Sequence, residues 1–317
     1  MKPSLRGLFV PLITPFSEDG DLASGALEKL AHAVIDAGAA GIVALGTTGE
    51  PATLTAAERH TVLDIAARTC RERGATLIAG AGSNDTAGSV RELRDLSAWP
   101  EVSAALTVVP YYTRPSEEGV VAHFTRLALH SPVPLIVYNI PYRTGRVLSA
   151  RTLLRLAGVP GIAGVKHAVG AVDQDTVLLM AGLTTAGSAA AAPATAAATA
   201  TASAAATQPG GFAVLAGDDA FASPLLALGA AGGILASAHL RTGEFAELIA
   251  AWHAGEAGRA AALGHRLAPL SAVLFAEPNP AVIKGVLHAQ GLIPSSAVRL
   301  PLLPAGQDSV RAAIALC

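Results

Sequence analysis

Short apolar segments recur along this chain about every thirty residues, and their spacing restricts the possible folds more than any other feature of the sequence. The segments are apolar throughout and do not alternate with polar residues, which is typical of parallel strands buried on both faces. Segments with helical periodicity lie between them, and eight such strand–helix units are what a closed (β/α)8 barrel requires. We therefore predict an α/β TIM-barrel fold, with strands at residues 8–13, 41–45, 76–79, 104–109, 135–138, 162–166, 212–216 and 233–236.

Two helix signals support this order of elements. Leu27, Leu30 and Val34 are spaced as one face of a helix, and Gly38 follows where that helix should end. The segment 55–58, Thr-Ala-Ala-Glu, has the pattern of a capping box that opens the next helix. Both signals lie between two of the predicted strands, where the barrel pattern requires a helix.

The pattern becomes helical after the last predicted strand. Asn279 precedes Pro280, which predicts a helix N-cap followed by a proline at the first helical position. We therefore predict a barrel domain over residues 1–240 and a C-terminal helical appendix over residues 241–317. The helices expected in this part are at residues 242–253, 257–275 and 280–290.

One connection is longer than the others, because residues 183–210 form a low-complexity tract of Ala, Thr and Ser between the sixth and seventh strands. Removing about 25 residues would restore an ordinary crossover length. We therefore interpret the tract as a surface insertion after the sixth helix, flexible or partly helical, and not as a domain boundary.

The composition excludes several classes of protein. Apolar residues make up 51% of the chain and charged residues 15%, a balance that excludes intrinsic disorder. A net charge of −2 gives no basic surface for nucleic acid, and no run of about 20 strongly apolar residues could span a membrane. Cys70 and Cys317 cannot form a disulfide framework, and the first residues do not resemble a signal peptide. We therefore expect a cytoplasmic protein.

Lys166 is the strongest candidate for a catalytic residue. It is one of only four lysines and lies within an otherwise neutral, apolar strand. Burial of an ammonium group lowers its pKa, and the neutral amine is the nucleophile that forms a Schiff base with a carbonyl compound. In a barrel, side chains at the carboxyl ends of the strands face the active site. The residues alone also allow a structural lysine paired with a carboxylate.

Other strand ends carry further candidates. Tyr138 could transfer protons, although a tyrosine in this position could equally be a core residue. The turn at residues 46–50 has small residues and two hydroxyl groups that suit a carboxylate, or it could be a helix-capping loop. Arg143 could bind a second carboxylate or be a solvated surface arginine.

The acidic pair Asp218-Asp219 is more consistent with capping of the seventh helix than with metal binding. The nine histidines show none of the spacings typical of metal ligands. We therefore expect no metal site.

Taken together, these motifs resemble the dihydrodipicolinate synthase / N-acetylneuraminate lyase family of pyruvate-dependent class I aldolases, over essentially the whole chain except the Ala/Thr tract. Arg143, the segment Glu277-Pro-Asn-Pro280 with Lys284, and Arg299-Leu-Pro301 look most like the dihydrodipicolinate synthase branch. The resemblance is carried by GTTGE at residues 46–50, PYYTRPS at 110–116, YNIPYRTG at 138–145, the lysine-bearing strand and GDD at 217–219.

The resemblance implies a TIM barrel that condenses pyruvate with L-aspartate 4-semialdehyde, giving 4-hydroxy-tetrahydrodipicolinate for lysine and diaminopimelate biosynthesis. It implies no cofactor beyond the covalent Schiff base, and a homotetramer or a tight dimer. Lys166 would condense with pyruvate, and Tyr138 would donate and accept protons. Thr47 would link Tyr138 to Tyr112, which in this family reaches in from a neighbouring subunit. The substrate-binding residues implied are Thr48, Gly217 and Ile234 for pyruvate and Arg143 for the aldehyde.

Two residues depart from the pattern of the family. His167 stands where many relatives carry an acidic residue, which predicts an altered charge beside the imine. Tyr142 replaces a small residue, which predicts a narrower pocket for the second substrate. Two other functions stay open: an aldolase that uses pyruvate with another aldehyde, such as a sugar acid, and a non-catalytic barrel that binds a keto acid.

Overall fold

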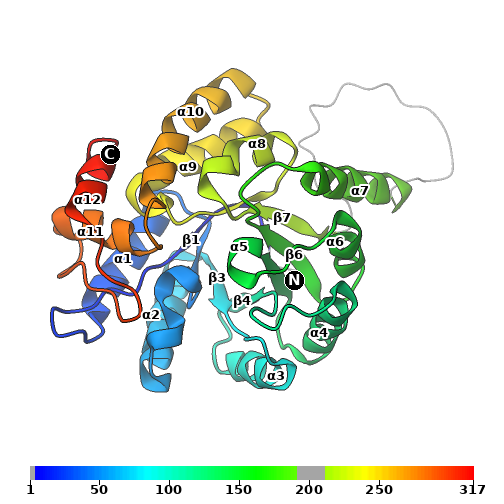
Figure 1. The fold of residues 1–317 in the computed structure, drawn as a ribbon, viewed down its shortest axis with the longest axis horizontal. Coiled ribbons are helices and arrows are strands. Elements are labelled where there is room, and N and C mark those ends of the chain that lie inside the picture. The colour runs from blue at the N-terminus through cyan, green and yellow to red at the C-terminus, as the bar shows by residue number, and fades with distance from the viewer. Residues whose placement is uncertain (1–3, 191–210) are drawn as a thin grey trace.

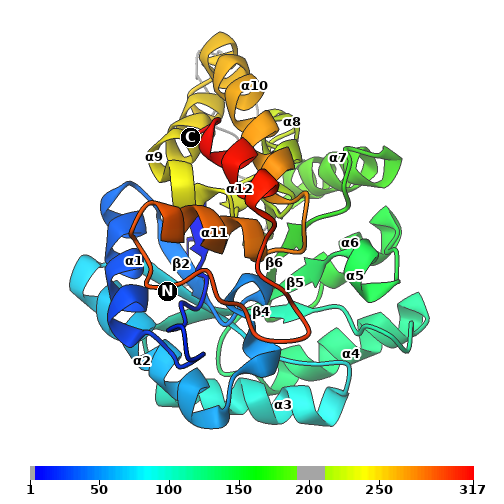
Figure 2. The same cartoon turned by 60° about the vertical axis from the view of Figure 1, so that its left-hand side comes forward.

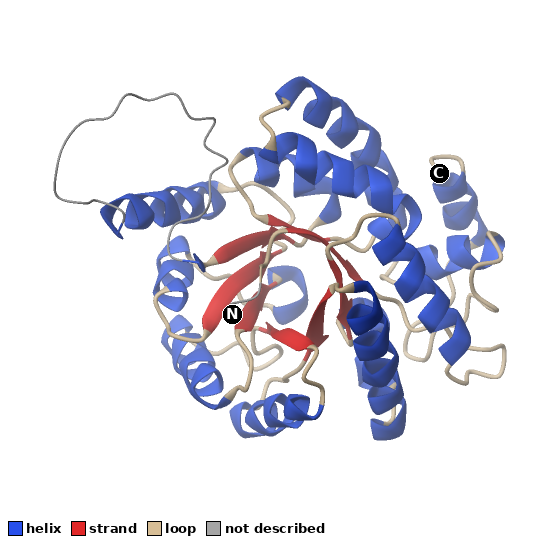
Figure 3. Cartoon of the chain, turned by 180° about the vertical axis from the view of Figure 1, so that it is seen from behind, coloured by secondary structure: helices blue, strands red, loops and turns tan. Residues whose placement is uncertain are grey.

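The computed structural model describes residues 4–190 and 211–317. Within these residues, eight parallel strands pair in chain order and close into a barrel, because β1 pairs with both β2 and β8. Figure 3 shows the strands at the centre of a ring of helices. The TIM-barrel prediction is confirmed. The strands are β1 (Gly7–Pro11), β2 (Gly41–Ala44), β3 (Thr76–Gly80), β4 (Val102–Val108), β5 (Leu135–Asn139), β6 (Ile162–His167), β7 (Ala213–Ala216) and β8 (Gly232–Ile234).

Helices cover the outside of the barrel (Figure 1). The predicted capping box is present at the start of α2, where the Thr55 side chain accepts from the Glu58 N–H and Glu58 accepts from the Thr55 N–H. The helices of the barrel are α1 (Ser24–Asp36), α2 (Ala56–Arg73), α3 (Thr86–Asp95), α4 (Glu117–His130), α5 (Pro141–Thr144), α6 (Ala150–Ala157), α7 (Gln174–Ala190), α8 (Ala222–Ala227) and α9 (Ala238–His253).

The chain ends in three more helices, α10 (Ala257–Leu274), α11 (Ala281–Ala289) and α12 (Gln307–Ile314). Helix α10 packs on α8 and α9, and α11 packs on α9 and α12. Figure 2 shows the segment between α11 and α12 crossing in front of the strands. The sequence pattern gives no signal for α12, which is short and has only one fully buried residue, Ala313.

Apolar side chains form separate layers inside and outside the barrel. The inner layer includes Phe9, Val43, Ile78 and Ile136, all fully buried. The outer layer joins the strands to the helices, as expected for a parallel sheet that is buried on both faces. No helix in the described part of the chain is long and apolar enough to cross a bilayer.

The Ala/Thr tract begins inside α7, which extends to Ala190. The rest of the tract, residues 191–210, lies outside the described residues, so its nature as a surface insertion stays a prediction. The predicted boundary at residue 240 falls within α9 and also stays a prediction.

Candidate active site

A cavity of about 500 Å³ lies where the carboxyl ends of the strands meet their following loops. Tyr112 is the one predicted site residue that does not line it, and its side chain is 88% exposed. The segment 275–279, which no sequence argument linked to the site, forms part of the wall. The predicted residues that the cavity brings together are Lys166, Tyr138, Thr47, Thr48, Arg143, Gly217 and Ile234.

Lys166 points into the barrel because of its register in the sheet. It lies opposite Tyr138 of β5 and Leu215 of β7, and both of these belong to the inner layer. The Lys166 side chain is buried, and its Nζ lies 4.2 Å from the centre of the Tyr138 ring. An amine at the cavity floor is therefore stacked on the candidate proton donor.

Burial lowers the pKa of Lys166 to about 8, against an attraction from Asp219 that works in the opposite direction. Relative to an ordinary lysine with a pKa of 10.5, this gives roughly 300-fold more neutral amine at pH 7. Among the described residues no carboxylate oxygen lies within 4.0 Å of the Lys166 amine, so it forms no ion pair. The alternative considered for Lys166, a structural lysine paired with a carboxylate, is found at Lys284, whose Nζ lies 2.5 Å from Glu50 Oε1 outside the cavity.

We expect kcat/KM for pyruvate to increase with pH and to level off above an apparent pKa near 8. The amine is a nucleophile only when it is neutral, so activity should fall as pH drops through the pKa of Lys166 in the free enzyme. A steady-state pH profile with the second substrate saturating measures this. A profile that is flat from pH 6 to about 9 would contradict the prediction.

Tyr138 is protonated at neutral pH. Burial raises its pKa above the usual range, and the nearby Arg143 guanidinium and a hydrogen bond from Thr47 only partly offset this effect. Tyr138 therefore carries its phenolic proton at pH 7, and Thr47 is a hydrogen-bonding neighbour of its side chain.

Gly217 gives the Lys166 side chain its space. A Cβ atom at this position would lie 2.6 Å from Lys166 Cγ and 2.9 Å from Cε, both closer than contact distance. The Gly217 N–H also donates to the carbonyl of His167, which fixes the loop after β7 against β6. A glycine is needed here for close approach and not for backbone freedom.

The hydroxyl-bearing turn follows β2 as a short 3-10 helix, Thr47–Gly49. Leu45 and Glu50 flank it with φ of 55° and 52°, a conformation that residues other than glycine adopt only where the surroundings enforce it. Glu50 supplies part of that constraint, because its buried carboxylate accepts from Lys284 Nζ and from the Arg299 N–H.

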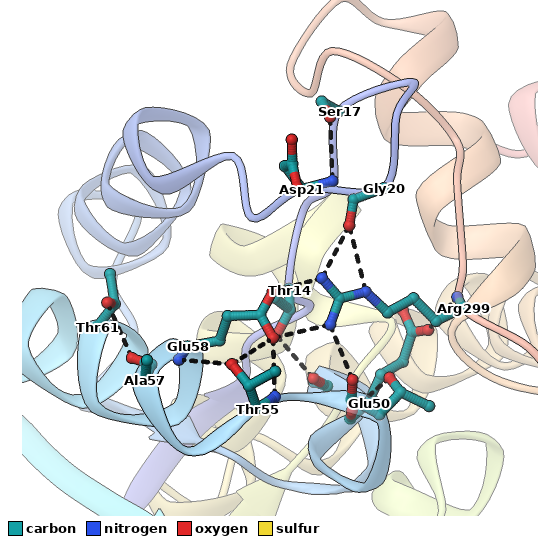
Figure 4. A network of polar contacts seen from close by, with 12 residues as sticks. Thr14, Ser17, Gly20, Asp21, Glu50, Thr55, Ala57, Glu58, Thr61 and Arg299 are labelled. Atoms are coloured by element: carbon teal, nitrogen blue, oxygen red, sulfur yellow. Dashed lines mark hydrogen bonds and ion pairs between the residues drawn. The ribbon is translucent and has the colours of Figure 1, made fainter.

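Arg299 holds the next part of the same loop (Figure 4). Its guanidinium donates to the carbonyls of Gly20 and Thr53 and forms an ion pair with Glu58, which lowers the pKa of that carboxyl to about 2. The C-terminal segment therefore fixes the active-site turn from outside the barrel.

Asn279 is a site residue that the sequence analysis assigned to a different role. The prediction that it caps a helix is wrong: α11 begins at Ala281, and no side chain caps it. The Asn279 Nδ2 group instead donates to Thr48 Oγ1 over 2.9 Å, with both residues buried. The Asn-Pro dipeptide is a common helix signal, so only the long-range packing of the segment could have revealed the contact.

The two aspartates after β7 are also placed differently from the prediction. Neither aspartate is the N-cap of α8, which begins at Ala222, but Asp218 is at the N-cap position of the 3-10 turn Asp219–Phe221 that leads into this helix. Asp219 is buried and accepts from the Ser237 N–H at 2.5 Å, and burial raises its pKa to about 6. Asp218 lines the cavity, and burial raises its pKa as well.

His167 points away from the cavity. It follows Lys166 in the strand, so its side chain lies on the opposite face, where Nε2 is 2.9 Å from Thr176 Oγ1 of α7. Burial lowers the pKa of His167 to about 4, so the ring is neutral at pH 7. His167 therefore brings no charged side chain into the cavity, and the effect on the imine of replacing an acidic residue by His167 stays a prediction.

Arg143 and Tyr142 lie together at the cavity mouth on α5. The Arg143 Cζ is 4.9 Å from the centre of the Tyr142 ring, and the Tyr142 side chain is 74% exposed. Both residues line the cavity, so Tyr142 is placed where a second substrate would pass. Within residues 4–190 and 211–317, no group of three or more His, Cys, Asp or Glu side chains could hold a metal ion.

The chain matches the model of the Dihydrodipicolinate synthetase family over residues 4–186 and 189–315. It is 37% identical to a 4-hydroxy-tetrahydrodipicolinate synthase of Neisseria gonorrhoeae, with 98% of each chain covered. It is 34% identical to 4-hydroxy-tetrahydrodipicolinate synthase 2 of Clostridium acetobutylicum, with 96% of each covered.

Solved structures agree with the sequence relatives. The dihydrodipicolinate synthase of Acinetobacter baumannii, determined as a complex with pyruvate, superposes with a TM-score of 0.86 at 34% identity, and 98% of each chain is covered. The family model, the sequence relatives and the solved structures therefore agree, and the chain belongs to the Dihydrodipicolinate synthetase family of enzymes.

Proposed function

We propose that this enzyme condenses pyruvate with L-aspartate 4-semialdehyde through a Schiff base on Lys166 and needs no other cofactor. The observation that carries the proposal is a buried lysine that forms no ion pair with any described residue and shares one cavity with Tyr138 and Arg143. This set supplies one nucleophile, one proton carrier and one cation for a substrate carboxylate. The same set argues against a barrel that only binds a keto acid, because binding requires no neutral amine.

The reaction begins when the Lys166 amine attacks the keto carbon of pyruvate. Tyr138 donates the proton with which the keto oxygen leaves as water, and an imine forms. The Tyr138 phenolate then takes a methyl proton and gives the enamine, whose carbon attacks the aldehyde carbon and forms the new C–C bond while the aldehyde oxygen takes a proton from Tyr138. The amine of the second substrate then attacks the imine carbon, closes the ring and releases Lys166.

Two parts of the cavity suit the two carboxylates of the substrates. The backbone at Gly217 lies beside Lys166, and the Thr48 hydroxyl lines the same cavity; both suit the carboxylate of pyruvate. Arg143 is at the mouth and suits the carboxylate of the aldehyde. The test is an assay of condensation products from pyruvate with L-aspartate 4-semialdehyde and, separately, with sugar-acid aldehydes. A higher kcat/KM for a sugar-acid aldehyde would replace this proposal with the alternative aldolase.

Tyr112 is expected to act in the active site of a second copy of the chain. Its backbone φ is 68°, and its side chain is 88% exposed and does not line the cavity of its own chain. We expect it to complete the proton relay from Tyr138 and Thr47 in a neighbouring subunit, within a homotetramer or tight dimer in the cytoplasm.

Asp218 favours an aldehyde that carries an amine. Its carboxylate lies in the same cavity as Arg143, and both act electrostatically on Tyr142, Tyr138 and Lys166. The N–H groups of Gly170 and Ala220 stabilise the charged form of Asp218, although it is largely buried. The Arg143 guanidinium and the Asp218 carboxylate in one cavity therefore match the carboxylate and the ammonium group of an amino acid.

We therefore expect Asp218→Asn to lower kcat/KM for L-aspartate 4-semialdehyde by about ten- to a hundredfold, the range for a hydrogen bond between charged groups. Succinic semialdehyde has the same carboxylate and aldehyde but no amine, so its kcat/KM as an alternative substrate should change less than about twofold. Steady-state kinetics with both aldehydes measures the difference. An equal decrease in kcat/KM with both aldehydes would show that Asp218 does not recognise the amine.

A further inference from the structure

We infer that Asn279 is a positioning residue that makes the Thr48 hydroxyl a hydrogen-bond donor toward the carboxylate of pyruvate. The inference rests on the proposed function, because it takes pyruvate as the first substrate. It assigns a role to a residue of the C-terminal region, from the segment 275–279 that forms part of the cavity wall.

The contact between the two residues is direct and shielded from water. Asn279 Nδ2 lies 2.9 Å from Thr48 Oγ1, and the two residues are 8% and 4% exposed. Both line the cavity that contains Lys166. A hydrogen bond in such surroundings is stronger than one in water and fixes the orientation of both groups.

The direction of this hydrogen bond determines what Thr48 can do next. A hydroxyl group has one proton, and an Nδ2 group can only donate. With the Asn279 amide oriented so that Nδ2 faces Thr48, the hydroxyl accepts and its own proton is left for another acceptor. Within residues 4–190 and 211–317, Thr48 Oγ1 donates to no protein acceptor. The remaining partner is a group inside the cavity, and an anionic carboxylate beside Lys166 is the best acceptor for that proton.

A second connection holds the same two segments together. Lys284 lies one turn into α11, and its Nζ donates to Glu50, two residues after Thr48. The Lys284 backbone N–H donates to the carbonyl of Pro280, directly after Asn279. Asn279 therefore reaches Thr48 from a helix that is itself anchored to the Thr48 turn, which keeps the hydroxyl direction fixed before substrate arrives.

The test reverses the hydrogen bond. In Asn279→Asp the carboxylate can only accept, so the Thr48 proton turns toward position 279 and a negative charge faces the substrate carboxylate. We expect the pyruvate concentration for half-maximal trapping by cyanoborohydride to increase about tenfold or more. Asn279→Ala leaves the hydroxyl free to rotate and should give a smaller increase.

Pyruvamide, a keto compound without a carboxylate charge, separates positioning from a general structural defect. Its half-maximal trapping concentration should change less than about twofold in both variants, and KM for the aldehyde should stay within the same limit. Asn84→Asp is the matched control, because it introduces the same charge at an exposed asparagine outside the cavity. It should behave as the unmodified enzyme.

The outcomes distinguish a failure of the inference about Asn279 from a failure of the proposed function. If the unmodified enzyme traps pyruvate and Asn279→Asp traps it equally well, Asn279 has no role in binding. The same conclusion follows if the half-maximal trapping concentrations of pyruvate and pyruvamide increase equally in both variants, since the defect is then structural. If the unmodified enzyme traps no pyruvate, the proposed function fails and this inference fails with it. Trapping uses no aldehyde, so an error in the second substrate leaves the test unaffected.

Discussion

Lys166→Met is expected to abolish covalent trapping of pyruvate and to lower kcat by about 10⁴-fold or more, because no other group in the cavity can form the imine. Methionine keeps the length and apolar contacts of the lysine stem, so the cavity should persist. Borohydride reduction with pyruvate, intact mass and peptide mapping measure the loss of the adduct.

The chain offers two controls for this variant. Lys29→Met removes an exposed lysine of α1 and should trap pyruvate normally. Lys284 is the other buried lysine, but its Nζ is paired with Glu50 and the carbonyl of Ala297. A pyruvate adduct on Lys284, or on any lysine in the Lys166→Met protein, would contradict the assignment.

Tyr138→Phe is expected to lower kcat by about 10²- to 10⁴-fold, the usual contribution of a positioned general acid–base group. The ring should keep its packing in the inner layer and its contact with Lys166, so the fold and the site of the adduct should not change. Imine formation should become slower because water has to supply the proton.

Single-turnover trapping of pyruvate measures the slower step directly, and circular dichroism checks the fold. Tyr111→Phe is the matched control, since this tyrosine also loses only a hydroxyl and lies outside the cavity with Lys166. If Tyr138→Phe retained more than about a tenth of the activity, another group would be the proton donor.

The barrel could be predicted from the sequence because its signals are local. Parallel strands covered on both faces give uninterrupted apolar runs, and every predicted strand overlaps an observed one. The placement of Lys166, Tyr138 and Arg143 around one cavity could also be predicted, since the carboxyl ends of barrel strands and the loops that follow them surround the same opening. These predictions needed no knowledge of which segments meet in space.

The remaining features depend on contacts between distant segments. Asn279 meets Thr48 across 231 positions of sequence, and Asp219 meets the Ser237 N–H. Both were interpreted as helix caps, because that is the local role of Asn and Asp before a helix. The environment of His167 is a related case: its neutral state depends on burial against α7, which the residues next to Lys166 do not indicate.

The anchoring of the Thr48 turn by Lys284 and Arg299 has a consequence for protein synthesis. All eight strands have been translated by residue 234, yet the two cations that support the turn are 50 and 65 residues further along. The support of the turn is therefore completed only by residues that are synthesised after the last strand of the barrel. A chain truncated after β8 would contain every strand but lack both cations that hold the turn in place.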